Sequence, residues 1–226
     1  MKTIGLIGGT SWTSTAEYYR ILNQNAEKRL GGIHSAKLLI ASIDLAELAD
    51  FMLSGRWDEG AEILKRAARS LEAGGAEGVI LCSNTTHRMF DAVARAIGIP
   101  MFHICDAIAA EIAARGFSRV ALLGTRETME GEYYRARLKR YCSIVIPEES
   151  ERAYIDDVIF KKLCRNVYDA ADRKEIAEIV GRLKMDGAEA VVLGCTELPH
   201  LMGELPMPRL DSVALHCAYA TDWAFA

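Results

Sequence analysis

Two cysteines stand at corresponding points of the chain, and both end an apolar run. Cys82 closes the run 78–82 and Cys195 closes the run 190–195. A histidine follows five residues after each of them, at His87 and His200. A thiolate accepts protons and a thiol donates them, so two thiols on opposite sides of one carbon atom can invert that carbon by proton transfer. The pair therefore indicates acid–base chemistry on a small molecule.

Polar side chains that suit a small carboxylate surround the two cysteines. Ser83, Asn84 and Thr85 follow Cys82, and Thr196 and Glu197 follow Cys195. Thr10 and Thr125 follow the glycine turn that opens each half of the chain. Hydroxyl and amide donors together with the N–H groups of a helix start bind carboxylates. The same helix start is expected to favour thiolate over thiol. Two roles stay open for Glu197, which can orient a substrate ammonium group or cap its helix. The two histidines can tune the thiols or simply pack.

An internal repeat relates the two cysteines. The pairs of similar segments occur in the same order in both halves: 4–8 with 120–124, 75–82 with 187–195, and 100–106 with 208–211. The chain is therefore interpreted as two copies of one α/β unit. Pseudo-twofold symmetry then predicts one cysteine on each wall of a shared cleft.

Short apolar runs alternate with helix-period segments along the whole chain. The predicted strands are 3–8, 37–43, 78–82, 101–104, 119–124, 143–146, 190–194 and 207–210. The predicted helices include 14–29, 57–73, 86–97, 107–115, 152–163 and 173–184. Continuously apolar strands separated by helices favour parallel sheets covered on both faces. The expected fold class is α/β, with two pseudo-symmetric lobes, each a short parallel sheet flanked by helices, and the active site in the cleft between them.

The repeat also predicts where the lobes divide. The segment 101–115 precedes the strand at 119–124, and its counterpart is the C-terminal segment from 207 to about 223. By that logic the C-terminal strand and helix belong beside the first strand. The first lobe is therefore expected to comprise 1–100 plus 208–226, and the second lobe 101–207.

Composition excludes several classes of protein. A net charge of −4 lacks the surplus of Lys and Arg that nucleic-acid binding needs. No apolar run approaches the ~18 residues that span a bilayer, and the N-terminus lacks a signal-peptide pattern, so a cytoplasmic location is expected. The six cysteines are scattered, which disfavours disulfides and a zinc site. The first glycine cluster lacks nucleotide-motif spacing, so neither a cofactor nor a metal is expected.

The motifs around the two cysteines resemble the aspartate/glutamate racemase family, whose members work without pyridoxal phosphate. The resemblance rests on the segments 8–9, 82–87 and 193–197, and it covers nearly the whole chain. It is closest to the bacterial branch of L-aspartate/glutamate-specific or broad-specificity amino-acid racemases, through 8–12, 31–36 and 122–129. The resemblance implies an amino-acid substrate, a homodimer, and Cys82 and Cys195 as catalytic residues. It also implies carboxylate contacts from Asn84, Thr85 and Thr196, with Thr10 and Thr125 nearby.

Two departures from the family bear on the substrate. Archaeal-type aspartate racemases are expected to carry a basic residue after the second strand, whereas 44–53 contains no Arg or Lys. They are also expected to carry a lysine in the second lobe, where the best match here is Cys164, preceded by Lys161 and Lys162. Aspartate and glutamate are the leading substrates, and a wider range is compatible with these changes. Two alternatives remain: a non-catalytic two-lobed carboxylate binder, and a single-cysteine decarboxylase or isomerase of the same fold.

Overall fold

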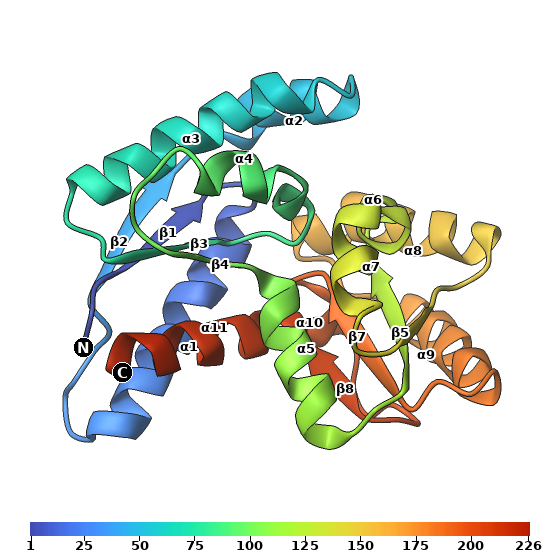
Figure 1. Ribbon diagram of the computed structural model, residues 1–226. Helices are drawn as coiled ribbons and strands as arrows, with labels where there is room; N and C mark the ends of the chain where they lie inside the picture. Colours follow the sequence, from blue (N-terminus) through green and yellow to red (C-terminus); the bar gives the residue numbers. More distant parts are fainter. The chain divides into compact units, whose positions relative to one another are not determined.

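The computed structural model describes residues 1–226, which divide into two compact units (Figure 1). Unit 1 comprises Met1–His103 and His216–Ala226, and unit 2 comprises Ile104–Leu215. Each unit contains one four-stranded sheet in which every neighbouring pair of strands is parallel. Helices flank each sheet, so the predicted fold class of two α/β lobes is confirmed.

Unit 1 is built on a sheet with the strand order β2-β1-β3-β4. Its strands are β1 (Ile4–Gly8), β2 (Leu38–Ser42), β3 (Gly78–Leu81) and β4 (Met101–Phe102). Its helical elements are α1 (Trp12–Leu30), α2 (Leu45–Leu53), α3 (Trp57–Ala73), the 3₁₀ helix η1 (Thr85–Met89), α4 (Phe90–Ala94) and the part of α11 (Ser212–Phe225) from His216 onward. The side chains of Ile7, Val79 and Leu81 form one core with α2, α3 and α4. Helices α1 and α11 cover the other face of this sheet (Figure 1).

Unit 2 repeats this plan with the strand order β6-β5-β7-β8. Its strands are β5 (Arg119–Gly124), β6 (Ser143–Val145), β7 (Ala190–Gly194) and β8 (Arg209–Asp211). Its helical elements are α5 (Ile104–Arg115), α6 (Arg126–Glu130), α7 (Glu132–Leu138), α8 (Glu149–Lys161), η2 (Leu163–Arg165), α9 (Ala170–Met185), α10 (Leu198–Leu201) and the start of α11. One core joins the sheet to α5 and α7, and the other joins it to α8, α9 and α10.

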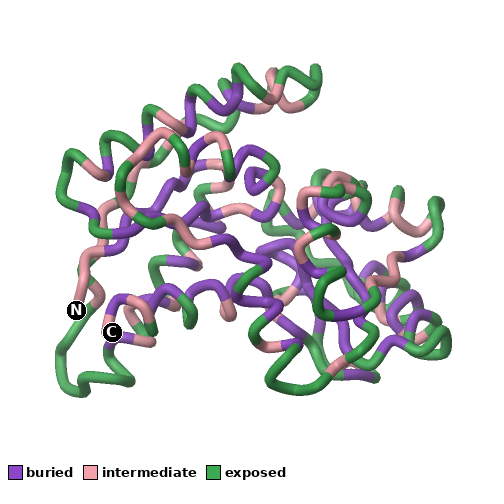
Figure 2. The backbone as a smooth tube through the Cα atoms, in the orientation of Figure 1, coloured by how far each residue is buried: buried purple, intermediate pink, exposed green.

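The central strands are buried along their length because each sheet has a core on both faces. Every residue of β1, β3 and β7 is buried (Figure 2). A strand that meets apolar side chains on both faces needs apolar residues at successive positions rather than alternate ones. This requirement explains why the apolar runs of the sequence locate all eight strands to within two residues at each end.

The last strand of each sheet lies in a different place from the one expected. The strand predicted at 207–210 was assigned beside the first strand, but β8 pairs with β7, with Val192 opposite Leu210. Likewise β4 pairs with β3 in unit 1 rather than opening the second lobe. The repeat logic fails here because each sheet takes in the strand that follows its own cysteine segment. Only the helices that come next, α5 and α11, pass into the other unit.

The observed helices also differ from the predicted ones at 86–97 and at α2. The pattern at 86–97 predicts a single helix, and the chain instead forms η1 followed by the short helix α4. Helix α2 was not predicted. It begins after Asp44, whose carboxylate accepts a hydrogen bond from the Ala46 N–H at 2.9 Å. The short helices around the cysteine segments are too brief for a periodic pattern to show.

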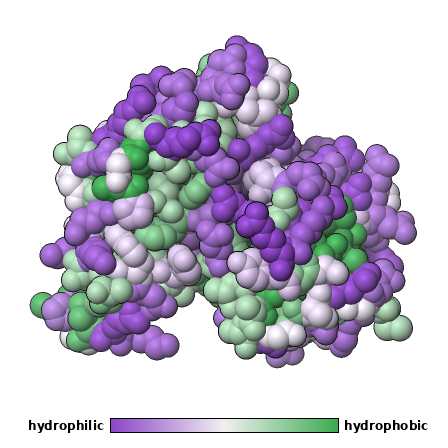
Figure 3. Space-filling view, in the orientation of Figure 1, coloured by the Kyte–Doolittle hydropathy of each residue, from purple (hydrophilic) through white to green (hydrophobic).

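On the face shown in Figure 3, hydrophobic areas are interrupted by hydrophilic ones. No helix of this chain has the length and apolar character that crossing a membrane requires.

Gly9, in the turn after β1, has a backbone conformation and surroundings that exclude other residues. Its φ is +91°, and a Cβ at this position would overlap the carbonyl oxygen of Ile43. Gly31 provides a matched control, because its φ is +75° and nothing lies within 4 Å of its Cβ position. We expect Gly9→Ala to lower the free energy of unfolding by about 3 kcal/mol or more, and Gly31→Ala by about 1 kcal/mol. Equal losses in urea denaturation would contradict the close approach at Gly9.

His216 links α11 to the rest of unit 1 and is expected to make the fold acid-sensitive. Its Nε2–H donates to the Phe102 carbonyl at 2.9 Å, and the Tyr18 hydroxyl donates to its Nδ1 at 2.9 Å. Burial lowers the pKa of this imidazole from 6.5 to about 4. As the pH falls below 6.5, His216 takes up a proton in the unfolded chain but stays neutral in the folded chain until the pH approaches 4. Stability that is complete above pH 6.5 is therefore lost between pH 6.5 and about 4.

The acid effect of His216 is measurable as a change in unfolding free energy. A pKa lowered from 6.5 to about 4 predicts a loss of about 3 kcal/mol across this pH range. His216→Gln keeps an amide donor for the Phe102 carbonyl and removes the titrating group. Urea denaturation at pH 7, 5.5 and 4 should show a clearly shallower loss in this variant. The same pH slope in both proteins would assign the acid sensitivity to other groups.

Candidate active-site residues

In unit 1 the turn after β1 meets the segment after β3. The Cys82 N–H donates to the Ile7 carbonyl at 3.0 Å, which continues the parallel pairing of Ile7 with Leu81. Cys82 therefore lies beside Gly8, at the carboxyl end of the sheet where ligands of parallel sheets bind. Thr10 follows in the same turn, and its Oγ1 atom is buried without a hydrogen-bond partner. An orphaned buried hydroxyl is costly, so this atom is well suited to meet a ligand.

The turn of unit 1 is held by capping interactions around Thr10. Ser11 is the N-cap of α1 and accepts a hydrogen bond from the Ser14 N–H, and the Gly9 N–H donates to the Thr15 hydroxyl at 2.9 Å. On the other side, Asn84 is buried within the Cys82 segment, while Ser83 and Thr85 are partly exposed. The predicted residues of this half, from Thr10 to Thr85, thus lie in the two segments that follow β1 and β3.

Unit 2 has the equivalent arrangement with a shift of one residue. Gly124 of β5 pairs with Gly194 of β7, so Cys195 lies one position beyond the last paired residues. In unit 1 the cysteine follows Leu81 directly, whereas in unit 2 Gly194 is inserted before it. Thr125 begins α6 as its N-cap, and its hydroxyl accepts from the Thr128 N–H at 3.3 Å. Thr125, Cys195 and the residues after them lie at the carboxyl end of the second sheet.

A buried thiol–carboxylate pair distinguishes unit 2 from unit 1. The Cys195 thiol donates to the Glu197 carboxylate with an Sγ–Oε2 distance of 3.1 Å, and the Thr196 hydroxyl donates to the same oxygen. All three residues are buried. At the corresponding position of unit 1, two residues after Cys82, stands the uncharged Asn84. Glu197 therefore contacts the Cys195 thiol directly, a contact that neither of the two roles predicted for it includes.

Burial favours the protonated form of both thiols, which runs against the expectation of thiolates. Burial raises the pKa of the Cys82 thiol far above its usual value. Burial, and next the negative charge of Glu197, raise the pKa of Cys195. The helix starts do not offset burial, because η1 is a five-residue 3₁₀ helix and α10 has only four residues. So short a helix has little dipole to stabilise a negative charge.

The two histidines of the repeat have different surroundings. His87 is buried, and its Nδ1–H donates to the Ser83 carbonyl at 2.7 Å, which fixes the turn next to Cys82. Its ring also lies against His103, with centroids 4.6 Å apart. His200 is exposed and lies against the Tyr168 ring with centroids 6.4 Å apart. His87 therefore supports the Cys82 segment through the backbone, and no such contact links His200 to Cys195.

Cys164 belongs to the same half of the site as Cys195, and the neighbouring lysines do not supply a free charge there. Cys164 lies in η2 and is exposed when the whole residue is considered. Partial burial of its thiol, and next the charge of Glu197, raise the pKa of this thiol to about 11. Lys162 pairs with the buried Asp172 at 2.7 Å, and Lys161 pairs with Asp157 at 2.7 Å. Neither lysine therefore replaces the one that the archaeal-type enzymes are expected to carry.

The other cysteines and the ionisable groups form no further cluster of this kind. Cys105, Cys142 and Cys217 are buried and none of them follows a central strand, as expected for core residues. No group of three or more His, Cys, Asp and Glu side chains is placed to hold a metal ion.

Two α/β units thus make up this protein, and in each of them a buried cysteine follows a central parallel strand. The chain belongs to the Asp/Glu/hydantoin racemase family, whose sequence profile matches residues 7–220. It is 37% identical to a Yersinia pestis protein classed with the Asp/Glu racemases, over 100% of both chains and with a TM-score of 0.94. It is 33% identical to an aspartate racemase homologue from Pyrococcus horikoshii, again over 100% of both chains, with a TM-score of 0.88.

More distant relatives carry more specific descriptions. The chain is 24% identical to the broad-specificity amino-acid racemase RacX of Bacillus subtilis, over 93% of each chain. It is also 24% identical to the glutamate racemase of Thermus thermophilus over 153 residues, 66% of this chain and 51% of the relative. The match thus spans about half the length of that glutamate racemase.

Proposed function

We propose that this protein is an amino-acid racemase that works by transferring the α-proton between two cysteines without a cofactor. Aspartate and glutamate are the leading substrates, with a wider range of amino acids accepted. The observation that carries the proposal is the buried pair of Cys195 and Glu197, whose Sγ and Oε2 atoms lie 3.1 Å apart. A second buried thiol, Cys82, follows the corresponding strand of the repeat. Family membership and the relatives named as racemases support the same reaction class.

The first step of the proposed reaction forms the base. The Cys195 proton moves to Glu197, which leaves a thiolate beside a neutral carboxylic acid. The thiolate takes the α-proton from one face of the substrate, and the electron pair of the broken C–H bond moves into the substrate carboxylate. That carboxylate then carries additional negative charge, which preorganised donors stabilise. Thr10, Ser83, Asn84, Thr85, Thr125 and Thr196 are the proposed donors.

The second step inverts the carbon. Cys82 gives its thiol proton to the opposite face, so the product has the other configuration and Cys82 becomes a thiolate. Glu197 holds the proton first taken from Cys195, and its return to Cys82 through solvent restores the starting state. In this direction Cys195 is the base, because Glu197 adjoins its thiol, and Cys82 is the acid. Cys82 and Cys195 exchange these roles in the reverse direction. A homodimer remains a prediction from the family resemblance, and a cytoplasmic location remains a prediction from the sequence pattern.

Proton NMR in D₂O tests this function on the unmodified protein without an added cofactor. L-Glu, L-Asp and a panel of neutral L-amino acids are each incubated with the protein. We expect the α-proton signal to disappear and the optical rotation to decay towards zero for at least one of them. The order of rates ranks the substrates. A panel that keeps its α-protons and its rotation would favour the carboxylate binder, and exchange without loss of rotation would favour a single-cysteine reaction.

A further inference from the structure

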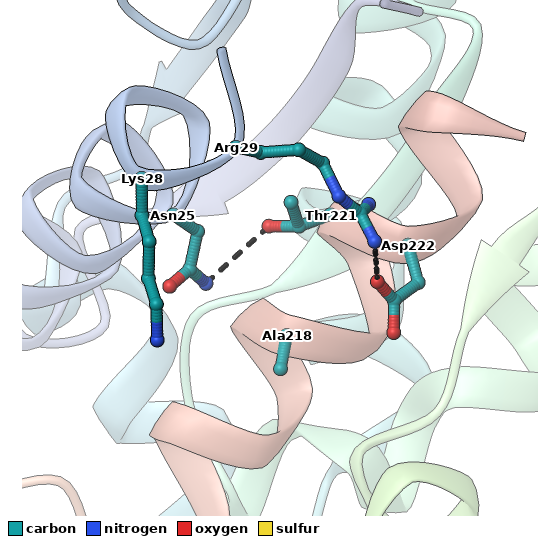
Figure 4. A pocket seen from close by; sticks show the side chains of 6 residues that line it. All are labelled: Asn25, Lys28, Arg29, Ala218, Thr221 and Asp222. Carbon is teal, nitrogen blue, oxygen red and sulfur yellow. Dashed lines mark hydrogen bonds and ion pairs between the residues drawn. The ribbon is translucent and has the colours of Figure 1, made fainter. Parts of the chain in front are cut away.

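Unit 1 has a hollow on each of its helical faces, and the two differ in charge. The first, of about 360 Å³, lies between α1 and α11 (Figure 4). Arg29 points towards Asp222 and pairs with it at 2.7 Å, while the Asn25 amide lies 3.4 Å from the Thr221 hydroxyl. The charged groups of this hollow largely satisfy one another, which leaves Lys28 as its one unmatched charge.

The second hollow lies between α3 and the C-terminal end of α4, and it gathers positive charge. It has a volume of about 220 Å³ and is lined by Lys65, Arg69, Ala92, Arg95 and Ala96. Two small alanines form the apolar part of the lining, and three cationic side chains from two segments surround them. We call this site the basic hollow.

Acidic side chains neutralise only part of the charge of the basic hollow. Lys65 pairs with Glu62 at 2.7 Å, but neither Arg69 nor Arg95 forms an ion pair. Arg69 uses its Nε–H to donate to the Ala96 carbonyl at 3.4 Å, which orients its guanidinium group across the hollow. The positive potential extends to Glu62: Lys65 lowers the pKa of this carboxylate most, and Arg69 and Arg66 add to the effect.

A bound anion would relieve the repulsion among these cations. Like charges held around one small hollow repel each other, and the whole chain is acidic, with a net charge of −4. Guanidinium groups present several N–H donors in a plane, a geometry that matches phosphate oxygens. A hollow of 220 Å³ is smaller than a typical pocket for a drug-sized ligand, so it suits a compact group.

We propose that the basic hollow binds a phosphate or diphosphate group, with Arg69 and Arg95 as its main ligands. Lys65 contributes a point charge at the same rim. The group can be a free inorganic anion or part of a nucleotide. A nucleotide would make additional contacts that strengthen binding, and a free anion would not. The lining of this hollow includes neither Cys82 nor Cys195, and the proposal does not depend on racemase activity.

Thermal unfolding of the full-length protein with inorganic diphosphate, at constant ionic strength, tests the proposal. The Tm should rise with diphosphate concentration, because a ligand that binds only the folded state stabilises it. Arg69→Gln with Arg95→Gln should weaken the apparent binding at least about tenfold. Arg66→Gln with Arg140→Gln is the matched control, since it removes the same charge from exposed arginines outside the hollow. This control should bind diphosphate as the wild type does.

Two results would overturn the site. One is an equal weakening in both double variants, which would mean attraction by overall charge. The other is a wild-type Tm that diphosphate does not raise above sodium chloride of the same ionic strength. A parallel titration with ADP identifies the source: tighter binding than diphosphate indicates a nucleotide, and equal binding indicates the free anion. Because the four substituted arginines are exposed, the variants should unfold near the wild-type Tm without ligand.

Discussion

Replacing either Cys82 or Cys195 by serine is expected to lower racemisation by about 10⁴-fold or more. Serine is nearly isosteric with cysteine, but its hydroxyl is a far weaker acid. Each direction of the proposed reaction needs both thiols, one as the base and one as the acid, so the two losses should be similar. Circular dichroism of the substrate, starting from each pure enantiomer, measures the rate.

Cys142→Ser is the control for this pair. Cys142 is also buried, but it precedes β6 and does not follow a central strand. Its variant should racemise at close to the wild-type rate. Substantial racemisation by the Cys82→Ser protein would contradict the two-base assignment, and loss of activity in all three variants would point to a general effect on folding.

Glu197→Gln is expected to have the next largest effect. Glutamine keeps the shape and an acceptor oxygen for the Cys195 thiol, but it cannot take the thiol proton. The buried thiol then has to lose its proton to solvent, which its raised pKa opposes. We expect the rate at neutral pH to fall by about 10²-fold or more, which is the usual contribution of general acid–base catalysis.

The pH profile separates this role from substrate binding. In the wild type the proton moves inside the Cys195–Glu197 pair, whereas in Glu197→Gln the rate should keep rising as the pH increases above 7. Glu204→Gln, an exposed change after α10, should leave the profile unaltered. A Glu197→Gln enzyme with a higher KM and the wild-type pH profile would instead assign Glu197 to the substrate ammonium group.

Much of the fold could be predicted because burial on both faces leaves a direct mark in the sequence. The strands β5 and β7 are apolar at successive positions, and the predicted ranges at 119–124 and 190–194 equal the observed ones. The placement of β4 and β8 could not be predicted in the same way. The repeat shows which segments correspond, but hydrogen bonding between strands decides which sheet each strand joins.

The sequence names the residues of the candidate site, and their roles stay predictions, but it does not show the asymmetry between the two cysteine segments. The spacing of Cys195 and Glu197 was visible in the sequence, yet their hydrogen bond depends on the rotamers of two buried side chains. The protonated state of both thiols was likewise missed. It follows from burial and from the shortness of η1 and α10, and neither can be read from the residues after the cysteines. The contrast of Glu197 with Asn84 was the available signal.

The most direct test of the two-cysteine reaction measures how fast deuterium replaces the α-proton of the substrate. Each pure enantiomer is incubated in D₂O with each of the two serine variants. A single remaining cysteine can still remove and return a proton on its own face of the substrate. The two-base reaction predicts that Cys82→Ser exchanges the α-proton of only one enantiomer of glutamate or aspartate and that Cys195→Ser exchanges only the other. Exchange of the same enantiomer by both variants, or of both enantiomers by either one, would contradict it.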